Sequence, residues 1–390
     1  MFICDNRQPS ATVFITIMRI LSSGYHATLS YSDPTAWLQR IDFYTGILEA
    51  LATKHEVHSI EHINARTSLQ QTGVHYHFRP LPSQRFPWSG HRFIRSLRPD
   101  LVLINGVSFP LQVLQLRAAL GQGPRILLWH RDEKPAPGWR GRLQAMAGRA
   151  VDGYLFTSPG NVAAWVARGI IPASKVHYLL HGSSVFLPGD RTEARQMLGV
   201  PIDAPLFLWV GRLDANKDPL TVLRAFSALL EEAPRAKLAM AFGGGPLEAE
   251  LRAFVAGDPK LSGAVQLLGT LPHRDLEPWY RAAGFFVSAS HYEGGGIAFC
   301  EALSCGCIPV YTRIPSLQQL AGPCGVSFPP GDAAALQQAF RQALRLDAAA
   351  QRTEVLQRFQ EHFSFTAIAR GLLHIVEDSV SVPSANKAIH

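Results

Sequence analysis

Residues 288–306 read SASHYEGGGIAFCEALSCG and follow the apolar run at residues 285–287. The run predicts a buried strand, and the glycines at 294–296 predict a loop that opens a helix over Ile297 to Ser304. Such a loop presents bare backbone N–H groups and the positive end of the helix dipole to an anion. Because glycine also serves tight turns, a phosphate site here needs support from other residues.

Two glutamates supply part of that support. Glu293 lies at the entrance of the loop, and Glu301 lies about one turn into the predicted helix. The rest of this helix is apolar on almost every side, which is typical of a buried helix. A lone carboxylate there costs several kcal/mol, roughly, unless it is paired or bound to a ligand. Ribose hydroxyls would supply that bonding, and so would a structural ion pair with an arginine.

Apolar runs alternate with amphipathic stretches along the whole chain. The expected strands are Arg19–Leu21, Leu101–Ile104, Ile126–Trp129, Gly153–Thr157 and Val176–Leu180 in the first half, and Leu206–Val210, Lys237–Phe242, Val265–Leu268, Phe285–Ser288, Ile308–Tyr311 and Gly325–Phe328 in the second. Nearly continuous apolar strands between helices are typical of parallel sheets covered on both faces. The glycine-, serine- and proline-containing break at Ser183–Asp190 predicts a hinge between two doubly wound α/β domains, over residues 1–184 and 185–363.

The loops that follow the strands are the expected ligand sites of such sheets. Arg212 and Lys217 follow the strand Leu206–Val210, and two cations at this position can clamp a diphosphate. Asp218-Pro219 predicts a helix N-cap followed by proline at the first helical position. Two further loops, residues 242–251 and 267–283, are candidates to wall a nucleobase.

The charge of the chain is unevenly distributed. The net charge of the 390 residues is +7, with 19 Lys+Arg against 10 Asp+Glu in residues 1–185 and 18 against 20 in residues 186–390. The basic first half predicts an acidic partner, such as an anionic membrane surface, a phosphorylated lipid or, least expected, nucleic acid. Residues 79–100 combine five arginines with aromatic and aliphatic side chains, and residues 138–149 form a second basic stretch. Both suit a membrane interface or an anionic acceptor, and a solvated helix equally.

Cysteine usage and hydropathy indicate the compartment. The five cysteines are Cys4, Cys300, Cys305, Cys307 and Cys324. An odd, clustered set argues against a disulfide framework and favours a reducing, cytoplasmic location. Cys305 and Cys307 lack the usual zinc-site spacing and are expected to be small buried residues. The apolar run at residues 11–17 is too short to span a bilayer and lacks the features of a signal peptide. Residues 1–17 are therefore either an extension or the product of an unused upstream start.

The second half of the chain resembles the donor domain of glycosyltransferase family 4. The matching features come in the family's order: Gly211, Arg212 and Lys217; Gly243 to Pro246; Leu268 to Ala282; and Glu293 and Glu301 in an E-x₇-E motif followed by ALSCGCIPV. The resemblance covers roughly residues 200–332 and implies the GT-B fold, two Rossmann-like parallel-sheet domains with a cleft between them. Residues 363–373 resemble the family's final helix, expected over 364–379 and crossing back to the first domain, before a disordered tail at 380–390.

The resemblance also implies roles for the residues of the second half. Arg212 and Lys217 would hold the diphosphate of a UDP- or GDP-linked hexose, and Glu301 would bond the ribose. Glu293 would contact the transferred sugar, which the amides of Gly294 to Ile297, those of Gly295 and Gly296 included, would approach. Gly244 and Leu271 belong to the loops expected around the nucleotide.

Three further positions follow from the same resemblance. Gly24, in the loop after the first strand, would face the donor phosphate, although the family usually has paired glycines there. His130, at the end of the strand Ile126–Trp129, would touch the donor sugar. Where the family commonly has a bulky residue, this chain has Gly295, which we expect to widen the floor of the pocket.

Taken together, these features predict a retaining hexosyltransferase that needs neither cofactor nor metal. Its acceptor would be bound by the basic first domain, with lipid-linked, polysaccharide and small soluble acceptors all open. A peripheral position at the inner face of the membrane is one alternative for its location. A GT-B epimerase or phosphorylase and a non-catalytic binding protein remain alternative functions. A nicotinamide-dependent oxidoreductase is disfavoured, because the loop at residues 22–26 lacks the G-x-G-x-x-G turn.

Overall fold

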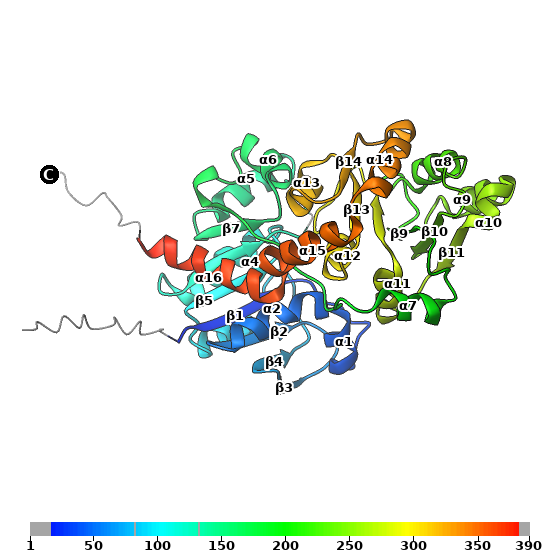
Figure 1. The fold of residues 1–390 in the computed structure, drawn as a ribbon. Coiled ribbons are helices and arrows are strands. Elements are labelled where there is room, and N and C mark those ends of the chain that lie inside the picture. The colour runs from blue at the N-terminus through cyan, green and yellow to red at the C-terminus, as the bar shows by residue number, and fades with distance from the viewer. Residues whose placement is uncertain (1–16, 82, 132, 382–390) are drawn as a thin grey trace, which may run out of the picture.

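The computed structural model describes residues 17–81, 83–131 and 133–381. Residues 1–16 of the possible extension, Cys4 among them, and residues 382–390 of the predicted tail therefore lie outside the described residues. The prediction of a disordered tail from residue 380 is wrong for residues 380 and 381, which belong to the last helix. Within the described part, the chain forms two parallel sheets, each covered by helices on both faces (Figure 1). The two doubly wound domains expected from the sequence are thus confirmed as the architecture.

The first sheet has eight strands in the order β3-β4-β2-β1-β5-β6-β7-β8. They are β1 Arg19–Gly24, β2 Glu56–Glu61, β3 Thr67–Gln71, β4 Val74–Phe78, β5 Leu101–Asn105, β6 Arg125–Trp129, β7 Gly153–Phe156 and β8 Val176–Tyr178. All pairings are parallel except that of the hairpin β3–β4, whose turn holds Thr72 and Gly73 at positive φ. The sequence pattern did not predict β2, β3 or β4.

The second sheet has six parallel strands in the order β11-β10-β9-β12-β13-β14. They are β9 Leu206–Gly211, β10 Lys237–Phe242, β11 Val265–Gly269, β12 Phe285–Ser288, β13 Ile308–Thr312 and β14 Val326–Phe328. All six expected strands are present, because each is a nearly uninterrupted apolar run. The reversal of strand order between β9 and β12 is the point at which a doubly wound sheet binds its ligand.

Helices follow almost every strand. Those of the first half are α1 Pro34–Arg40, α2 Asp42–Ala52, α3 Trp88–Ser96, α4 Pro110–Leu120, α5 Gly138–Ala147 and α6 Pro159–Ala167. Those of the second half are α7 Arg191–Leu198, α8 Pro219–Leu229, α9 Glu248–Gly257, α10 Pro259–Ala264, α11 Glu277–Ala282, α12 Ile297–Ser304, α13 Pro315–Ala321, α14 Ala333–Arg345, α15 Ala348–Arg358 and α16 Phe365–Ser381. Short helical turns η1 Ala173–Lys175, η2 His273–Leu276 and η3 Phe359–Phe363 complete the set.

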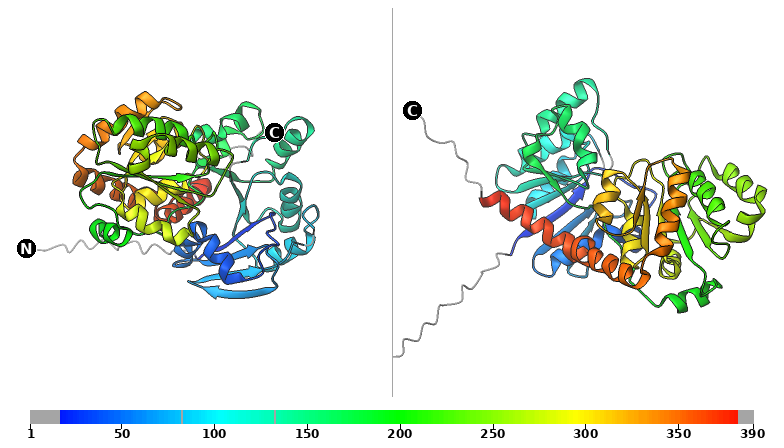
Figure 2. Two further views of the ribbon diagram at one scale, coloured as in Figure 1. Left: turned by 90° about the vertical axis from the view of Figure 1, so that its right-hand side faces the viewer. Right: turned by 45° about the horizontal axis from the view of Figure 1, so that its top comes forward.

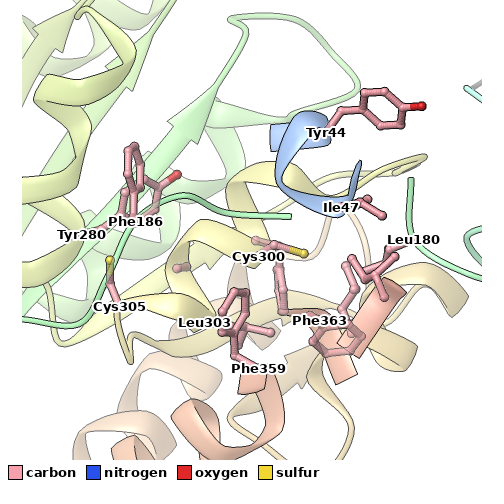
Figure 3. Close-up of a cluster of buried hydrophobic side chains, with 14 of the residues drawn as sticks. Tyr44, Ile47, Leu180, Phe186, Tyr280, Cys300, Leu303, Cys305, Phe359 and Phe363 are labelled. Atoms are coloured by element: carbon pink, nitrogen blue, oxygen red, sulfur yellow. The ribbon is translucent and has the colours of Figure 1, made fainter. Parts of the chain in front are cut away.

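Alternate residues of each strand enter different cores. In β5, Leu101 and Leu103 pack with α2 and α16, whereas Val102 and Ile104 pack with α3 and α4. This period of two is what a strand buried on both faces requires. The core that contains Leu101 is continuous across the two domains, and its central part joins α12 to η3 (Figure 3). The two sheets therefore share apolar packing at their junction.

The last helix, α16, returns to the first domain and lies along α2 (Figures 1 and 2). The contact is close, because a Cβ on Gly46 of α2 would lie 2.5 Å from the ring of Phe365. At the interdomain linker, Ser183 N–H donates to the carbonyl of Phe43 at 2.7 Å, and its hydroxyl donates to the carbonyl of Phe363. The linker is thereby held to both domains. No helix in the described part of the chain is long and apolar enough to cross a bilayer.

Candidate functional site

A cavity of about 410 Å³ lies at the carboxyl ends of the second sheet. The loop after β9 contributes Arg212 and Lys217, and the loop after β12 contributes Glu293, Gly295 and Gly296. The loops after β10 and β11 add Gly243, Thr270 and Leu271, and His181 enters from the segment between β8 and the interdomain linker. The strand-loop-helix pattern of the sequence thus brought Arg212, Lys217 and Glu293 into one cavity, whereas Glu301 and Gly294 are not among the residues that line it.

The central contact of the cavity joins Lys217 to Glu293. Lys217 Nζ donates to Glu293 Oε2 at 2.5 Å, and Ser290 Oγ donates to the same oxygen at 3.1 Å. Both charged side chains are largely buried, with 25% and 16% of their surfaces exposed. The sequence assigned these two residues to different parts of a donor, and it gave no sign that they pair with each other.

Arg212 is held much more loosely. Its side chain is 76% exposed, and its nearest carboxylate is Asp214 at 3.7 Å. An exposed ion pair of this kind contributes little to stability. The guanidinium is therefore able to turn toward an anion in the cavity at small cost.

Asn216 ties the two charged loops together, and sequence reasoning missed it. Its side-chain Nδ2 donates to the carbonyl of Tyr292 at 3.0 Å, and its Oδ1 accepts from the N–H of Tyr292 at 2.9 Å. Its own carbonyl accepts from His291 N–H at 2.8 Å. These three bonds set the position of Lys217 relative to Glu293. A single asparagine in a polar loop carries no sequence signal for such a role.

The loop continues into α8 as the sequence predicts. Asp218 is the N-cap, its carboxylate accepts from Thr221 N–H at 3.3 Å, and Pro219 occupies the first helical position. Asp218 has φ of +44°, a left-handed conformation that aspartate tolerates better than most residues. Its second oxygen lies 3.1 Å from Nε2 of His291 in the neighbouring loop.

Glu301 is 4% exposed in α12, and both of its oxygens are engaged. His273 Nε2 donates to Oε1 at 2.6 Å, and the hydroxyl of Tyr280 donates to Oε2 at 2.8 Å. The alternative expectation, a structural ion pair between Glu301 and an arginine, is therefore wrong, because a histidine and a tyrosine bond the two oxygens of the carboxylate. The hydrogen bond to Glu301 raises the pKa of His273, despite an opposing effect of burial. Contact between Glu301 and a ribose stays a prediction.

His273 also links Glu301 to the first domain. Its Nδ1 lies 4.0 Å from Oδ2 of Asp42, in α2, and its ring stacks on Phe186 at 4.7 Å. Burial raises the pKa of Asp42, while the charge of His273 opposes that rise. The histidine therefore stands between two carboxylates, one from each domain.

The loop glycines are constrained by close neighbours. Gly296 caps α12 with φ of +62°, and a Cβ there would lie 2.5 Å from Leu320. A Cβ on Gly295 would lie 2.6 Å from Cε1 of His181. The expectation that Gly295 widens the pocket floor is therefore wrong, because the His181 ring fills the vacated space. Burial lowers the pKa of His181 well below its usual value, so the ring is neutral near pH 7.

Three other predicted residues lie at the margin of this cavity or behind it. His130 is 1% exposed, bonds the carbonyl of Glu133 at 2.9 Å and stacks on Phe156, and it is not among the residues that line the cavity. Gly24 is the last residue of β1, paired with Asn105, rather than part of the following loop. Gly244, at φ of +79°, lies beside the cavity-lining Gly243. Their proposed contacts with a donor stay predictions.

The cysteines of the second domain belong to the hydrophobic core. Cys300, Cys305, Cys307 and Cys324 are unbridged and buried. Burial raises the pKa of the Cys307 thiol to about 12. Within residues 17–81, 83–131 and 133–381, no group of three or more His, Cys, Asp or Glu side chains is arranged to hold a metal ion.

Comparison with known proteins places this site in context. Residues 204–345 match the family model described as glycosyl transferases group 1. D-inositol 3-phosphate glycosyltransferase of Thermobispora bispora is 35% identical over 130 residues, which cover 32% of this chain and 30% of that protein. A Catenulispora acidiphila protein of the same description is 37% identical over 152 residues, 36% of each chain. The matches thus span about a third of the length of these relatives.

Similarity in three dimensions extends over nearly the whole chain. A glycosyltransferase from Rickettsia africae superposes with a TM-score of 0.70 at 15% identity, covering 94% of this chain and 100% of that one. Anabaena HepE, solved in complex with UDP and glucose, gives a TM-score of 0.66 at 14% identity, covering 93% and 100%. At these identities the likeness establishes the fold.

Proposed function

We propose that this chain is a glycosyltransferase of family 4 that transfers a hexose from a UDP- or GDP-sugar to an acceptor held by the first domain, with retention of configuration. The match of residues 204–345 to glycosyl transferases group 1 and the GT-B fold support this proposal. The observation that carries this proposal is the cavity in which Arg212, Lys217 and Glu293 meet. Cations and a carboxylate at the carboxyl ends of parallel strands are arranged as a diphosphate and its sugar would require.

The cations act on the leaving group. Breaking the bond between the anomeric carbon and the phosphate oxygen leaves negative charge on the diphosphate. Lys217 pairs with Glu293 in this structure and would donate hydrogen bonds to this phosphate instead. The exposed guanidinium of Arg212 would move toward the same phosphate. These two charges supply the electrostatic stabilisation, and in this proposal no divalent metal ion is required. Activity that persists in a chelator such as EDTA is the corresponding expectation.

Glu293 orients the sugar in this proposal. It is held by Lys217 and Ser290 at the mouth of the glycine loop. The acceptor hydroxyl forms its new bond to the anomeric carbon on the face from which the diphosphate departs, and its proton passes to the departing phosphate oxygen. Configuration is thereby retained without a covalent intermediate. Closure of the domains about Ser183–Asp190 would exclude water from this step.

The comparisons support a UDP-hexose among the possible donors, since the HepE structure contains UDP and glucose. The relatives named D-inositol 3-phosphate glycosyltransferase support an anionic acceptor. For the location of the protein we propose the cytoplasm, with peripheral contact to an anionic membrane. Helix α5 supports this contact, because Trp139 and Met146 are exposed beside Arg140, Arg142 and Arg149.

Thermal-shift binding tests the proposed donor site. UDP, GDP, ADP and their sugar conjugates are titrated into the wild type, Arg212→Ala and the control Arg235→Ala, an exposed arginine of the same domain whose carboxylate neighbour is Asp203. We expect one nucleotide to raise the melting temperature of the wild type and the control, and to act about tenfold more weakly on Arg212→Ala. If no nucleotide stabilises the wild type, the chain is not a working transferase.

A further inference from the structure

The first domain contains a cavity of its own, separate in its lining from the donor cavity. Its volume is about 550 Å³, within the range of pockets that enclose a small ligand. It lies at the carboxyl ends of β1, β2 and β4, where Ser23, Ile60 and Phe78 line it, and the first turns of α3 close it from the side. The hairpin β3–β4, which the sequence pattern did not predict, contributes Thr67, Ser68 and Phe78 to this cavity.

One wall of the cavity is apolar. Ile60, Phe78 and Ile94 are buried in the surrounding core, and Phe93 is partly buried against it. Polar side chains line the rest of the cavity, Ser23, Thr67, Ser68 and Ser89 among them. The apolar wall favours an aliphatic or aromatic group, because burying apolar surface is favourable.

The mouth of the cavity is cationic. Arg66 and Arg79 are the charged side chains that line it among the described residues, and no Asp or Glu lines it there. The guanidinium of Arg79 lies 4.1 Å from the centre of the Phe93 ring, which holds the charge beside the apolar wall. Burial lowers the pKa of His62, and lowers that of His91 to about 4, so both histidines are neutral at pH 7. The lining therefore carries two uncompensated positive charges.

One polar group inside the cavity has no protein partner. His91 is 1% exposed, and its Nε2 shares a hydrogen bond with the hydroxyl of Tyr25 at 3.0 Å. Its Nδ1 has no hydrogen-bond partner among the described residues. Buried nitrogens of this kind are usually satisfied, so His91 places an unpaired polar atom in the wall of the cavity.

We propose that this cavity binds the acceptor, and that the acceptor is an anionic amphiphile whose phosphate or carboxylate pairs with Arg66 and Arg79 while its apolar part lies against Phe78, Phe93 and Ile94. The proposal rests on the transferase function proposed above. Ser23 and Tyr25 flank Gly24, the residue that the family resemblance assigns to the donor phosphate. An acceptor hydroxyl at this end of the cavity would thus face the donor.

Calorimetric titration with simple phosphates tests the proposal on the full chain. The probes are inorganic phosphate, butyl phosphate, octyl phosphate, the uncharged octyl glucoside, and inositol phosphate, each below its micelle-forming concentration. We expect octyl phosphate to bind at least about tenfold more tightly than butyl phosphate, because its longer alkyl chain buries more apolar surface. Arg66→Ala and Arg79→Ala are each expected to weaken it about tenfold. The control Arg92→Ala, an exposed arginine of α3 outside the cavity, is expected to bind as the wild type does.

Several results would overturn the proposal. Inositol phosphate binding more tightly than octyl phosphate would mean that the acceptor is polar. Equal binding of octyl phosphate and octyl glucoside would mean that the cavity does not recognise the charge of the ligand. Unchanged octyl phosphate binding in the Arg66→Ala/Arg79→Ala double variant would locate the ligand elsewhere. UDP and GDP are titrated into the same preparations, so a failure of donor binding is seen separately from a failure of this cavity.

The same double variant identifies the source of the amphiphile. Wild type and double variant are sedimented with phosphatidylcholine vesicles that contain phosphatidic acid. If octyl phosphate binding is lost together with vesicle binding, the cavity takes a lipid headgroup. If octyl phosphate binding alone is lost, the cavity takes a soluble amphiphile, and the membrane is met by another basic surface such as α5.

Discussion

The imidazole of His181 occupies the place of a side chain at position 295: a Cβ on Gly295 would lie 2.6 Å from Cε1 and 2.8 Å from Nε2 of that ring. His181 comes from the end of the first domain, just before the interdomain linker, whereas Gly295 belongs to the glycine loop of the second domain. The Nδ1 of His181 has no hydrogen-bond partner among the described residues. The floor of the proposed donor cavity is therefore a histidine supplied from outside the domain that holds the rest of the site.

This relationship predicts the effect of a side chain at position 295. Gly295→Ala should lower the free energy of unfolding by about 1–3 kcal/mol, because the new methyl group collides with a buried ring. Adding His181→Ala should recover part of that loss, with a coupling energy on the order of 1 kcal/mol in a double-mutant cycle. Urea unfolding of the four proteins measures both values. Gly257→Ala, at a position with no neighbour within 4 Å, is the matched control. Additive effects of the two substitutions would show that the residues do not compete for space.

Lys217 should matter most for the chemical step. Lys217→Met removes a charge from the leaving diphosphate, so we expect kcat to fall about 10²- to 10³-fold. The change also leaves Glu293 with Ser290 as its remaining hydrogen-bond donor. Steady-state kinetics with the donor identified by thermal shift provides the measurement. Lys260→Met, in an exposed ion pair with Glu231, should leave kcat unchanged. A Lys217→Met enzyme with wild-type kcat would exclude Lys217 from leaving-group stabilisation.

Asn216 is expected to act as a positioning residue. Asn216→Ala removes two hydrogen bonds to Tyr292, each worth about 1 kcal/mol, and frees the loop of Lys217 from that of Glu293. We expect donor affinity to fall about tenfold while the protein stays folded. Asn216→Asp should restore little of this affinity, because aspartate keeps only the hydrogen bond accepted from the N–H of Tyr292. Asn64→Ala, an exposed asparagine of the first domain, serves as the control. Equal donor affinity in wild type and Asn216→Ala would refute the role.

The Asp42–His273–Glu301 contact predicts a pH dependence of stability. The pKa of His273 is raised from 6.5, so between 6.5 and the raised value the folded state binds more protons than the unfolded state. The stability that this histidine contributes is therefore complete below pH 6.5 and is lost as the pH rises through its folded pKa. The buried histidines with lowered pKa values, such as His181 and His91, act in the opposite direction.

The difference between wild type and His273→Gln isolates this contribution. We expect the stability gap between the two proteins, measured by urea unfolding, to be larger at pH 6 than at pH 8.5. A gap that grows with pH would contradict the raised pKa. Tyr280→Phe, which removes the other partner of Glu301, is expected to destabilise the protein by about 1–3 kcal/mol at both pH values, since the hydroxyl bond does not titrate in this range.

Much of the second domain could be predicted from its sequence, and less of the first. Strands such as β9 and β12 are nearly uninterrupted apolar runs, because both of their faces are buried. In contrast, β2 reads EVHSIE and β3 reads TSLQQ, with polar residues that local pattern cannot distinguish from a loop. These segments form strands because they pair with neighbouring strands of the sheet, and the cavity lined by Arg66 and Arg79 depends on them.

The sequence by itself determined the alternation of strands and helices, the glycine loop that opens α12, and the candidates Arg212, Lys217, Glu293 and Glu301, because these depend on residues close together along the chain. The tertiary structure alone decided the partners. Lys217 meets Glu293 across 76 residues, and Glu301 meets His273 across 28. His181 fills the space left by Gly295 only because the end of the first domain packs against the glycine loop. Contacts between distant segments follow from how the two sheets pack, and no local pattern of residue types encodes that packing.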